Sequence, residues 1–222
     1  MKVYRYIQNY QVEILNDPLT TANGIKHKQS AKISFFDINN NLIERKEYGV
    51  VDVKSLYKKI KDKSPIDVSN CLVRGFSLSE YRSKFNLNQN EKIDLIDFCA
   101  NDALFESEKV VDFSLANFTG TKADFTNAHF GSGNLSFLKA EFGNFPVSFK
   151  GTSYSEGNNI FQYAKFNSGK VNFDNATFEN GNLSFINTYF GNGNVSFKNV
   201  HFGNGDVSFA FATFKKGSVI FD

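Results

Sequence analysis

Phenylalanine recurs at every twelfth position through the second half of the chain. One series occupies positions 118, 130, 142, 166, 178, 190, 202 and 214, with Tyr154 in its single gap, and a second series runs from 113 to 221. The residue two positions earlier is almost always small or aliphatic, as with Ala164 before Phe166 and Leu183 before Phe185. Residues two apart lie on the same side of an extended backbone. Each repeat unit is therefore predicted to form two short strands with inward-facing rings.

Glycine and asparagine clusters separate the predicted strands. They occupy residues 131–134, 167–170, 179–182, 191–194 and 203–206. Glycine adopts positive φ readily and asparagine side chains bond to nearby backbone, so both favour corners. We expect two repeat units to close one four-sided coil of about 24 residues, with equivalent positions about 4.8 Å apart along the stack. A flat two-sided coil made of a single repeat unit is the rival geometry, and it is disfavoured because it would have to enclose two phenylalanines and an aliphatic residue.

The five-residue step within each unit resembles a known repeat family. A small residue two positions before a large centre occurs at 116–118, 123–125, 128–130, 140–142, 164–166, 176–178 and 212–214, which is similar to the pentapeptide-repeat family. The resemblance implies a mainly β fold, a right-handed quadrilateral β-helix (β-solenoid) whose centre residues and small predecessors point inward. Every second step here is seven positions rather than five, so we infer bulged corners. The expected core ladder is Phe125, Phe130, Phe137, Phe142, Phe149, Phe161, Phe166, Phe173, Phe178, Phe185, Phe190, Phe197, Phe202, Phe209, Phe214 and Phe221.

The first part of the chain lacks this repeat. We expect residues 1–92 to form a small α+β domain that caps the solenoid of residues 93–222, because an uncapped first coil would expose an unpaired strand edge and a disc of aromatic rings. Residues 93–105 are expected to form an irregular first coil, since the step from Phe105 to Phe118 is one position longer than the repeat.

Elements of the capping domain can also be predicted. Residues 31–38 and 42–53 have the pattern of a β-hairpin joined by a turn of asparagines. Asp52 is expected to cap a short helix whose apolar residues recur at helical spacing. Ser77 followed by Glu80 has the form of a capping box and predicts a second helix that extends to about Phe85.

The other end of the sequence shows no cap. Residues 219–222 are still in phase with the repeat. Three interpretations are open: a homodimer that pairs through the C-terminal end of the solenoid, edge protection by Lys215 and Lys216, or a chain cut from a longer protein. We favour the dimer or the truncation.

The composition is typical of a soluble protein of the cytoplasm. Hydrophobic side chains make up 41% of the 222 residues, enough for a real core. No apolar stretch has the length of a signal peptide or a membrane span, so we expect no membrane partner. Two cysteines, Cys71 and Cys99, are too few for a disulfide framework.

We expect no enzyme activity, cofactor or metal site. His129 and His201 are three predicted coils apart, which places them in one column of the surface about 14 Å from each other, too far to share a metal ion, so we expect them to be ordinary surface residues. Asp94, Asp97 and Asp102 lack the glycine and the distal glutamate of a calcium loop. The two cysteines are expected to be buried or idle rather than reactive. No nucleophile is paired with a base in the sequence.

The remaining function classes are binding functions. The resemblance admits a DNA mimic that modulates a type II topoisomerase, but residues 111–222 contain eight lysines and eight acidic residues and so lack the acidic surface this requires. Direct nucleic-acid binding is also not expected, because acidic neighbours balance the lysines near residue 60. We therefore expect a non-enzymatic scaffold that mediates protein–protein interaction with an unidentified protein partner, or with its own copy.

The repeat is least regular at residues 143–163. Pro146 enters there, and Asn159 takes an inward position held elsewhere by leucine or valine. Phe145, Ile160 and Tyr163 fall outside the inward series, and one interpretation is that they are exposed together as a partner contact. We favour the other interpretation, a degenerate coil with a local bulge.

Overall fold

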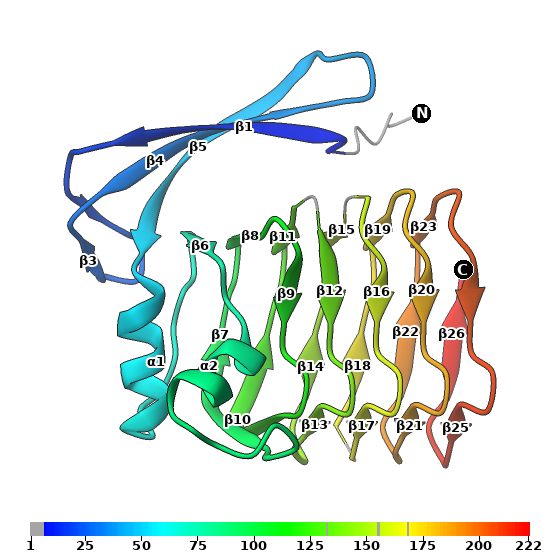
Figure 1. Ribbon diagram of the computed structural model, residues 1–222. Coiled ribbons are helices and arrows are strands. Elements are labelled where there is room, and N and C mark those ends of the chain that lie inside the picture. The colour runs from blue at the N-terminus through cyan, green and yellow to red at the C-terminus, as the bar shows by residue number, and fades with distance from the viewer. Residues whose placement is uncertain (1–6, 132, 155, 168) are drawn as a thin grey trace.

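The computed structural model describes residues 7–131, 133–154, 156–167 and 169–222, and it is built mainly of β-strands. The N-terminal elements are β1 (Asn9–Leu15), β2 (Leu19–Thr20), β3 (Lys26–His27), β4 (Ser30–Phe36), β5 (Leu42–Val51), α1 (Val53–Lys61), β6 (Cys71–Arg74), α2 (Leu78–Lys84) and β7 (Ile93–Cys99). A long stack of coils follows, and the chain can be traced along it from green to red in Figure 1.

Four columns of parallel strands form the sides of this solenoid. Face A contains β8 (Leu104–Glu106), β11 (His129–Phe130), β15 (Ser153–Tyr154), β19 (Thr177–Phe178) and β23 (His201–Phe202). Face B contains β9 (Val110–Asp112), β12 (Asn134–Ser136), β16 (Asn159–Ile160), β20 (Leu183–Ser184) and β24 (Val207–Ser208). Face C contains the first part of β10 (Ala116–Asp124), β13 (Glu141–Phe142), β17 (Lys165–Phe166), β21 (Tyr189–Phe190) and β25 (Thr213–Phe214). Face D contains the last part of β10, β14 (Val147–Ser148), β18 (Val171–Asn172), β22 (Val195–Phe197) and β26 (Val219–Phe221).

The strand register confirms that two repeat units make one coil. Phe118 pairs with Phe142, which pairs with Phe166, and the other three faces keep the same step. Rings at equivalent positions stack in register, as with Phe142 and Phe166, whose centroids are 4.5 Å apart and whose planes differ by 8°. A coil made of a single repeat unit would have paired Phe130 with Phe142, so the rival geometry is wrong.

The predicted core ladder lies along the axis of the solenoid. Its members from Phe125 to Phe197 are at most 2% exposed. Phe202, Phe209 and Phe214 are partly buried against the same core, and Phe221 in the last coil is 54% exposed. Asn159 is 2% exposed and donates a hydrogen bond to the carbonyl of Gly157 (3.1 Å), so it occupies the inward position expected of it.

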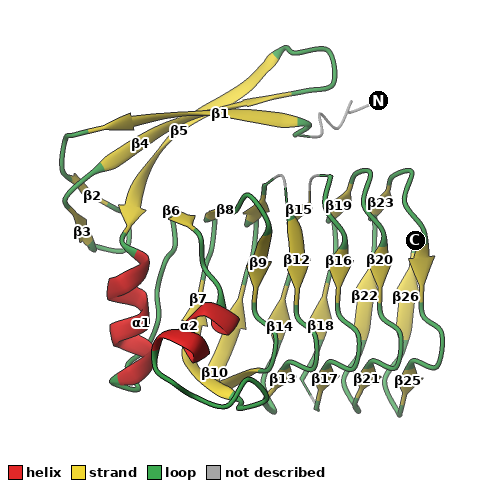
Figure 2. Ribbon diagram, in the orientation of Figure 1, coloured by secondary structure: helices red, strands yellow, loops and turns green. Residues whose placement is uncertain are grey.

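Several elements of the N-terminal part match the prediction. Strands β4 and β5 form the antiparallel hairpin, and β1 adds a third antiparallel strand to it. Asp52 caps α1, because its carboxylate accepts from the backbone N–H of Lys54 (3.0 Å). Ser77 caps α2 by accepting from the N–H of Glu80 (3.2 Å), while the N–H of Ser77 itself donates to the hydroxyl of Tyr57. Figure 2 shows both helices at the end of the solenoid where the chain enters it.

The capping region and the solenoid share one sheet. Strand β6, before the predicted boundary at residue 92, pairs in parallel with β5 on one side and with β8 on the other. The backbone N–H groups of Val68 and Asn70 also donate to the carbonyls of Cys99 and Asn101. Residues 66–76 are therefore already hydrogen-bonded to the first coil. Nine strands from β1 to β23 form a continuous sheet.

This sheet turns back over the outside of face A. Strands β1, β4 and β5 arch above β11 and β15 in Figure 1. Phe35 of β4 packs on the ring of His129 of β11 at 4.6 Å, and a second small core forms from Ala31, Ile33, Phe35, Tyr48, Leu72 and Leu104. Face A near the entry end is consequently covered.

Candidate interaction surface

Once in every repeat unit the chain turns through a residue with positive φ. These residues are Leu115, Asn127, Lys139, Gly151, Tyr163, Asn175, Asn187, Asn199 and Phe211, with φ between 52° and 65°. Glycine and asparagine tolerate this left-handed conformation, whereas a larger L-residue pays roughly 1–2 kcal/mol to adopt it. The turns between faces B and C contain Leu115, Lys139, Tyr163, Asn187 and Phe211.

Two aromatic residues occupy these strained turns and point into solvent. The side chain of Tyr163 is 49% exposed and that of Phe211 is 83% exposed. They lie two coils apart, or roughly 10 Å along the axis. The backbone of this turn does not require an aromatic side chain, because Asn187 forms the equivalent turn in the coil between them with nearly the same φ. Single exposed apolar side chains are ordinary on a protein surface, and these two are informative because they adjoin an apolar hollow on face B.

Face B beside this corner carries a shallow hollow of about 320 Å³. Its apolar part is formed by Ile160, Leu183 and Ile186. The other lining residues are Asn158, Gln162, Asn182, Ser184, Asp206 and Ser208, of which Asp206 is the one ionisable side chain. The surface is therefore nearly uncharged.

A ladder of asparagines holds one rim of the hollow in place. The side-chain oxygen of Asn134 accepts from the backbone N–H of Asn158 (2.9 Å), and that of Asn158 accepts from the N–H of Asn182 (3.1 Å). Asn182 accepts in turn from the N–H of Asp206 (2.9 Å). Because each side-chain oxygen is already engaged, the amide groups at this rim have fixed positions along the solenoid.

The three residues of the candidate partner contact are not equivalent in the structure. Ile160 lines the hollow, and Tyr163 lies in the turn that follows β16. Phe145 is only 7% exposed, so the interpretation that it is exposed with the other two is wrong. It lies between faces C and D and folds over Gly143, where a Cβ atom would come within 2.5 Å of its ring. The longer corner thus buries a ring outside the inward series.

Sequence reasoning missed Phe211. The sequence does carry a signal for this residue. Asparagine or glycine fills the equivalent position in five of the nine units, so an aromatic residue there opposes the local preference.

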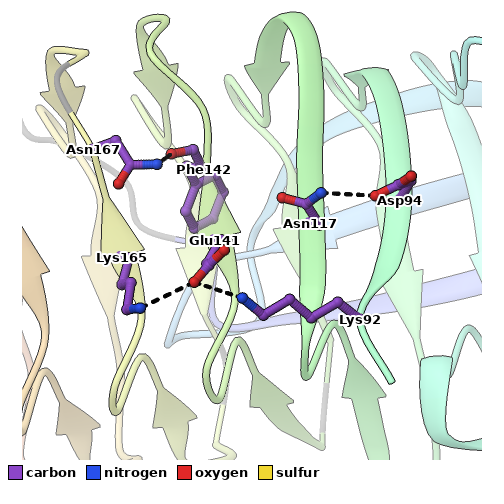
Figure 3. Close-up of polar contacts among 7 residues, drawn as sticks. All are labelled: Lys92, Asp94, Asn117, Glu141, Phe142, Lys165 and Asn167. Atoms are coloured by element: carbon purple, nitrogen blue, oxygen red, sulfur yellow. Dashed lines mark hydrogen bonds and ion pairs between the residues drawn. The ribbon is translucent and has the colours of Figure 1, made fainter. Parts of the chain in front are cut away.

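Face C carries a small group of paired charges. Glu141 lies between Lys92 and Lys165, with oxygen–nitrogen distances of 2.6 and 3.1 Å (Figure 3). The hydrogen bond from Lys92 is the main reason why the pKa of Glu141 lies below its usual value. Asn117 donates to Asp94 (2.7 Å) one coil earlier. The acidic groups of this face are thus paired with donors rather than gathered in an acidic column.

The other residues considered for chemistry do not assemble a reactive site. Asp97 accepts from the backbone and hydroxyl of Thr121, whereas Asp102 pairs with Lys46. No group of three or more histidine, cysteine or acidic side chains that could hold a metal ion occurs among the described residues. Within those residues there is also no helix long and apolar enough to cross a membrane.

The cysteines are free thiols inside the protein. Cys71 lies 3.4 Å from the Nε2 atom of His27, which is a nucleophile–base pairing in outline. Its side chain is fully buried, and burial raises the pKa of the thiol to about 12. The thiol is thus protonated at neutral pH and shielded from any substrate.

His129 and His201 do occupy one column, as predicted, with Ser153 and Thr177 between them. His129 is buried beneath β4, its Nδ1 atom is hydrogen-bonded to the hydroxyl of Ser153, and its desolvation lowers the pKa of the imidazole to about 3. A residue so enclosed serves the packing of face A rather than binding.

The chain was compared with protein-family models, with curated proteins and with solved structures, and none of the three comparisons found a match.

Proposed function

We propose that this protein is a non-enzymatic scaffold that mediates protein–protein interaction, and that its contact surface is the hollow of face B with the adjoining corner of Tyr163 and Phe211. The observation that carries the proposal is the exposure of two aromatic rings in turns where asparagine would cost less. Strain retained at an exposed position needs a compensating role, and binding is the role for which an exposed ring is suited.

The chemistry of the surface favours a protein partner. Tyrosine and phenylalanine bury a large area on contact and lose little side-chain entropy, so they act as anchors at protein interfaces. The amide rim supplies donors for backbone carbonyl groups of a partner, and the low charge makes desolvation inexpensive. Binding of nucleic acid would instead need a basic groove, and the lining of the hollow contains no lysine or arginine.

The test replaces each ring by the residue that the turn prefers. Tyr163→Asn and Phe211→Asn should leave the melting temperature unchanged or raise it, because asparagine relieves backbone strain of roughly 1 kcal/mol per site. Proteins captured by the wild-type chain from the native cell should be absent with the double variant, and one of them, purified, should bind the wild type but not the variant in calorimetry. Lys139→Asn, in the same column of turns, is the matched control and should bind normally. Equal binding by all variants would remove the proposal.

Membership of the pentapeptide-repeat family and a location in the cytoplasm remain part of the proposal. The inward pairs two residues apart and the four-sided coil support the first, and the two free cysteines agree with the second. Self-association through the last coil is likewise proposed, since Val207, Val219 and Phe221 there are between 36% and 54% exposed.

A further inference from the structure

The capping region contains a cavity of about 790 Å³, a volume within the usual range of small-molecule sites. It lies where β3, the end of β5 and α1 meet, and Figure 2 shows these three elements together at one end of α1. This α1 cavity shares no lining residue with the hollow of face B. A ligand bound in it would therefore leave the proposed contact surface free.

Part of the lining of the α1 cavity is apolar and preformed. The apolar lining residues are Ile25, Val50, Val51, Leu56 and Val68. The ring of His27 forms a wall, because its Nε2 atom lies 3.4 Å from the sulfur of Cys71 and the imidazole also donates to the carbonyl of Val50. A Cβ atom on Gly49 would overlap this ring, so the glycine provides the space for it. The protein itself thus holds the wall in place, as in a preformed ligand site.

Lys59 brings a positive charge to this cavity. Its side chain is half-buried and projects from the same face of α1 as Leu56, another lining residue. Burial lowers the pKa of His27 and the charge of Lys59 lowers it further, which indicates that the ammonium group lies near the wall. Lys26 and Lys28 also line the cavity, and within the described part of the chain none of the three lysines has an ion-pair partner.

The two carboxylates in the lining are already engaged by backbone donors. Asp52 accepts from the N–H of Lys54 (3.0 Å) as the cap of α1, and Asp67 accepts from the N–H of Ser69 (2.9 Å). Three lysines thus face two carboxylates, and His27 is uncharged at neutral pH because burial lowers its pKa. A cation partly withdrawn from water without a partner is unfavourable, and a bound anion would offset this cost.

We propose that the α1 cavity binds a small organic anion, an apolar body that carries one carboxylate, sulfonate or phosphate group. The anionic group pairs with Lys59, and the apolar body lies against Leu56 and Val68. An apolar lining with a few polar groups directed at one point is the usual composition of a ligand site. A neutral molecule of the same shape would leave the ammonium group unpaired, and an inorganic anion would leave the apolar surface bare.

A fluorescent probe with this chemistry tests the proposal on the full chain. Anilinonaphthalene sulfonate has aromatic rings and one sulfonate, and phenylnaphthylamine has the same rings without the charge. Fluorescence titration should show saturable binding of the sulfonate and binding of the neutral compound that is at least about tenfold weaker, the effect of one charge-assisted contact. Equal affinities would show an apolar site without preference for anions and would overturn the proposal.

Variants of α1 test the assigned cation. Lys59→Gln should weaken binding of the sulfonate about tenfold, whereas Lys59→Arg, which keeps the charge, should restore most of it. Lys58→Gln is the matched control, because Lys58 is on the same helix but pairs with Asp62 and does not line the cavity. Circular dichroism should be the same for all these proteins. Unchanged affinity in Lys59→Gln, or equal losses in Lys59→Gln and Lys58→Gln, would overturn the role of Lys59.

The location can be tested on the wild-type protein, so this part does not depend on any variant. In nuclear magnetic resonance spectra the sulfonate should shift the amide signals of residues 25–29 and 49–59 and leave those of residues 158–186 on face B unchanged. Naphthoate and naphthyl phosphate should displace the probe, and naphthol should not. Shifts on face B alone, or displacement by naphthol as effective as that by the two anions, would overturn the assignment of an organic-anion site to the α1 cavity.

Discussion

Tyr154 places a hydroxyl group inside a column that is otherwise made of phenylalanine. Its ring stacks between Phe130 and Phe178, with centroid distances of 5.2 and 4.3 Å. The neighbouring hydroxyl of Thr152 donates to the carbonyl of Phe149 (2.7 Å) and lies close enough to the phenol to lower its pKa, but within the described part of the chain the phenol makes no hydrogen bond of ordinary geometry. Burial has the larger effect and raises the pKa of Tyr154. An unsatisfied buried hydroxyl is a net loss of stability that the stacking must offset.

Tyr154→Phe should therefore stabilise the protein. The change keeps the stacked ring and removes a buried donor without a partner, which is expected to add about 1–2 kcal/mol to the free energy of unfolding. Urea denaturation followed by circular dichroism measures this difference. Tyr189→Phe, at a partly exposed position on face C, serves as the control and should change little. A loss of stability in Tyr154→Phe would mean that the hydroxyl has a partner after all.

At the scale of single residues, the repeat predicts which side chains point inward, but it does not predict where the side chains of the corners point. Period and spacing were sufficient to place Phe161 and Asn159 inside, because alternation along a strand fixes the side of each residue. Phe145 and Phe211 lie in turns, where the direction of a side chain depends on φ and on the room left by neighbours. Gly143 makes that room for Phe145, and no equivalent space receives Phe211.

The N-terminal sheet is the element whose packing could not be predicted. The hairpin and both helix caps follow from local signals, and all three were found. The return of β1, β4 and β5 over face A is set by contacts between residues far apart in sequence, such as Phe35 with His129. His129 was expected to be a surface residue, but the sheet covers it. No periodic pattern marks a strand face that another sheet will cover.

Covering His129 should make the protein sensitive to acid. The pKa of this imidazole is about 3 in the folded protein, because desolvation and the nearby charge of Lys46 disfavour the cation, against 6.5 when it is exposed. Between these two values the unfolded chain binds a proton that the folded chain does not, so stability falls as the pH is lowered through this range. The contribution is at most about 1.4 kcal/mol per pH unit.

Replacing the histidine isolates this effect. His129→Gln should reduce the slope of unfolding free energy against pH between about 6 and 4, by up to roughly 2 kcal/mol over that interval. Urea denaturation at several pH values measures both slopes. The comparison with wild type cancels the acid response of carboxylates that the two proteins share, such as Asp112 with its lowered pKa. Parallel curves would show that His129 takes up a proton freely in the folded state.

The whole molecule is a one-dimensional stack of coils, and we expect the stability of each coil to depend on its neighbours in the stack. Each coil contacts only the coils before and after it, and the rings inside it form edge-to-face contacts within a coil and parallel stacks between coils. The entry end is closed by α1, β6 and the sheet that folds over face A. The rings of the last coil stack on rings of the preceding coil only, and the side chains of the last coil are correspondingly more exposed. Local stability should thus decrease from the capped end toward Phe221.

Truncating equivalent rings at two heights of the stack tests this gradient. Phe185 is fully buried and stacks on both Phe161 and Phe209 at 4.9 Å, so Phe185→Ala should cost roughly 3–5 kcal/mol. Phe221 is 54% exposed and stacks only on Phe197 (5.0 Å), so its truncation removes about half as much buried surface and should cost much less. Lys198→Ala breaks an exposed ion pair with Asp222, which solvent screens, so it should change the melting temperature far less than Phe185→Ala.

Hydrogen exchange measured on the same variants distinguishes a stack of coils, each coupled to its neighbours, from a single cooperative core. In Phe185→Ala the amides of the coils beyond Phe185 should lose protection more than those beside α1, because coupling passes only between neighbouring coils. In Phe221→Ala the loss should be confined to the last coil. Uniform loss along the chain in both variants, or equal melting temperatures for Phe185→Ala and Lys198→Ala, would contradict the view that stacked rings set the stability of each coil. The same gradient affects partner binding. Tyr163 lies in the middle of the stack and Phe211 lies near its exposed end. A partner that binds both rings would therefore stabilise the coils that are least stable alone.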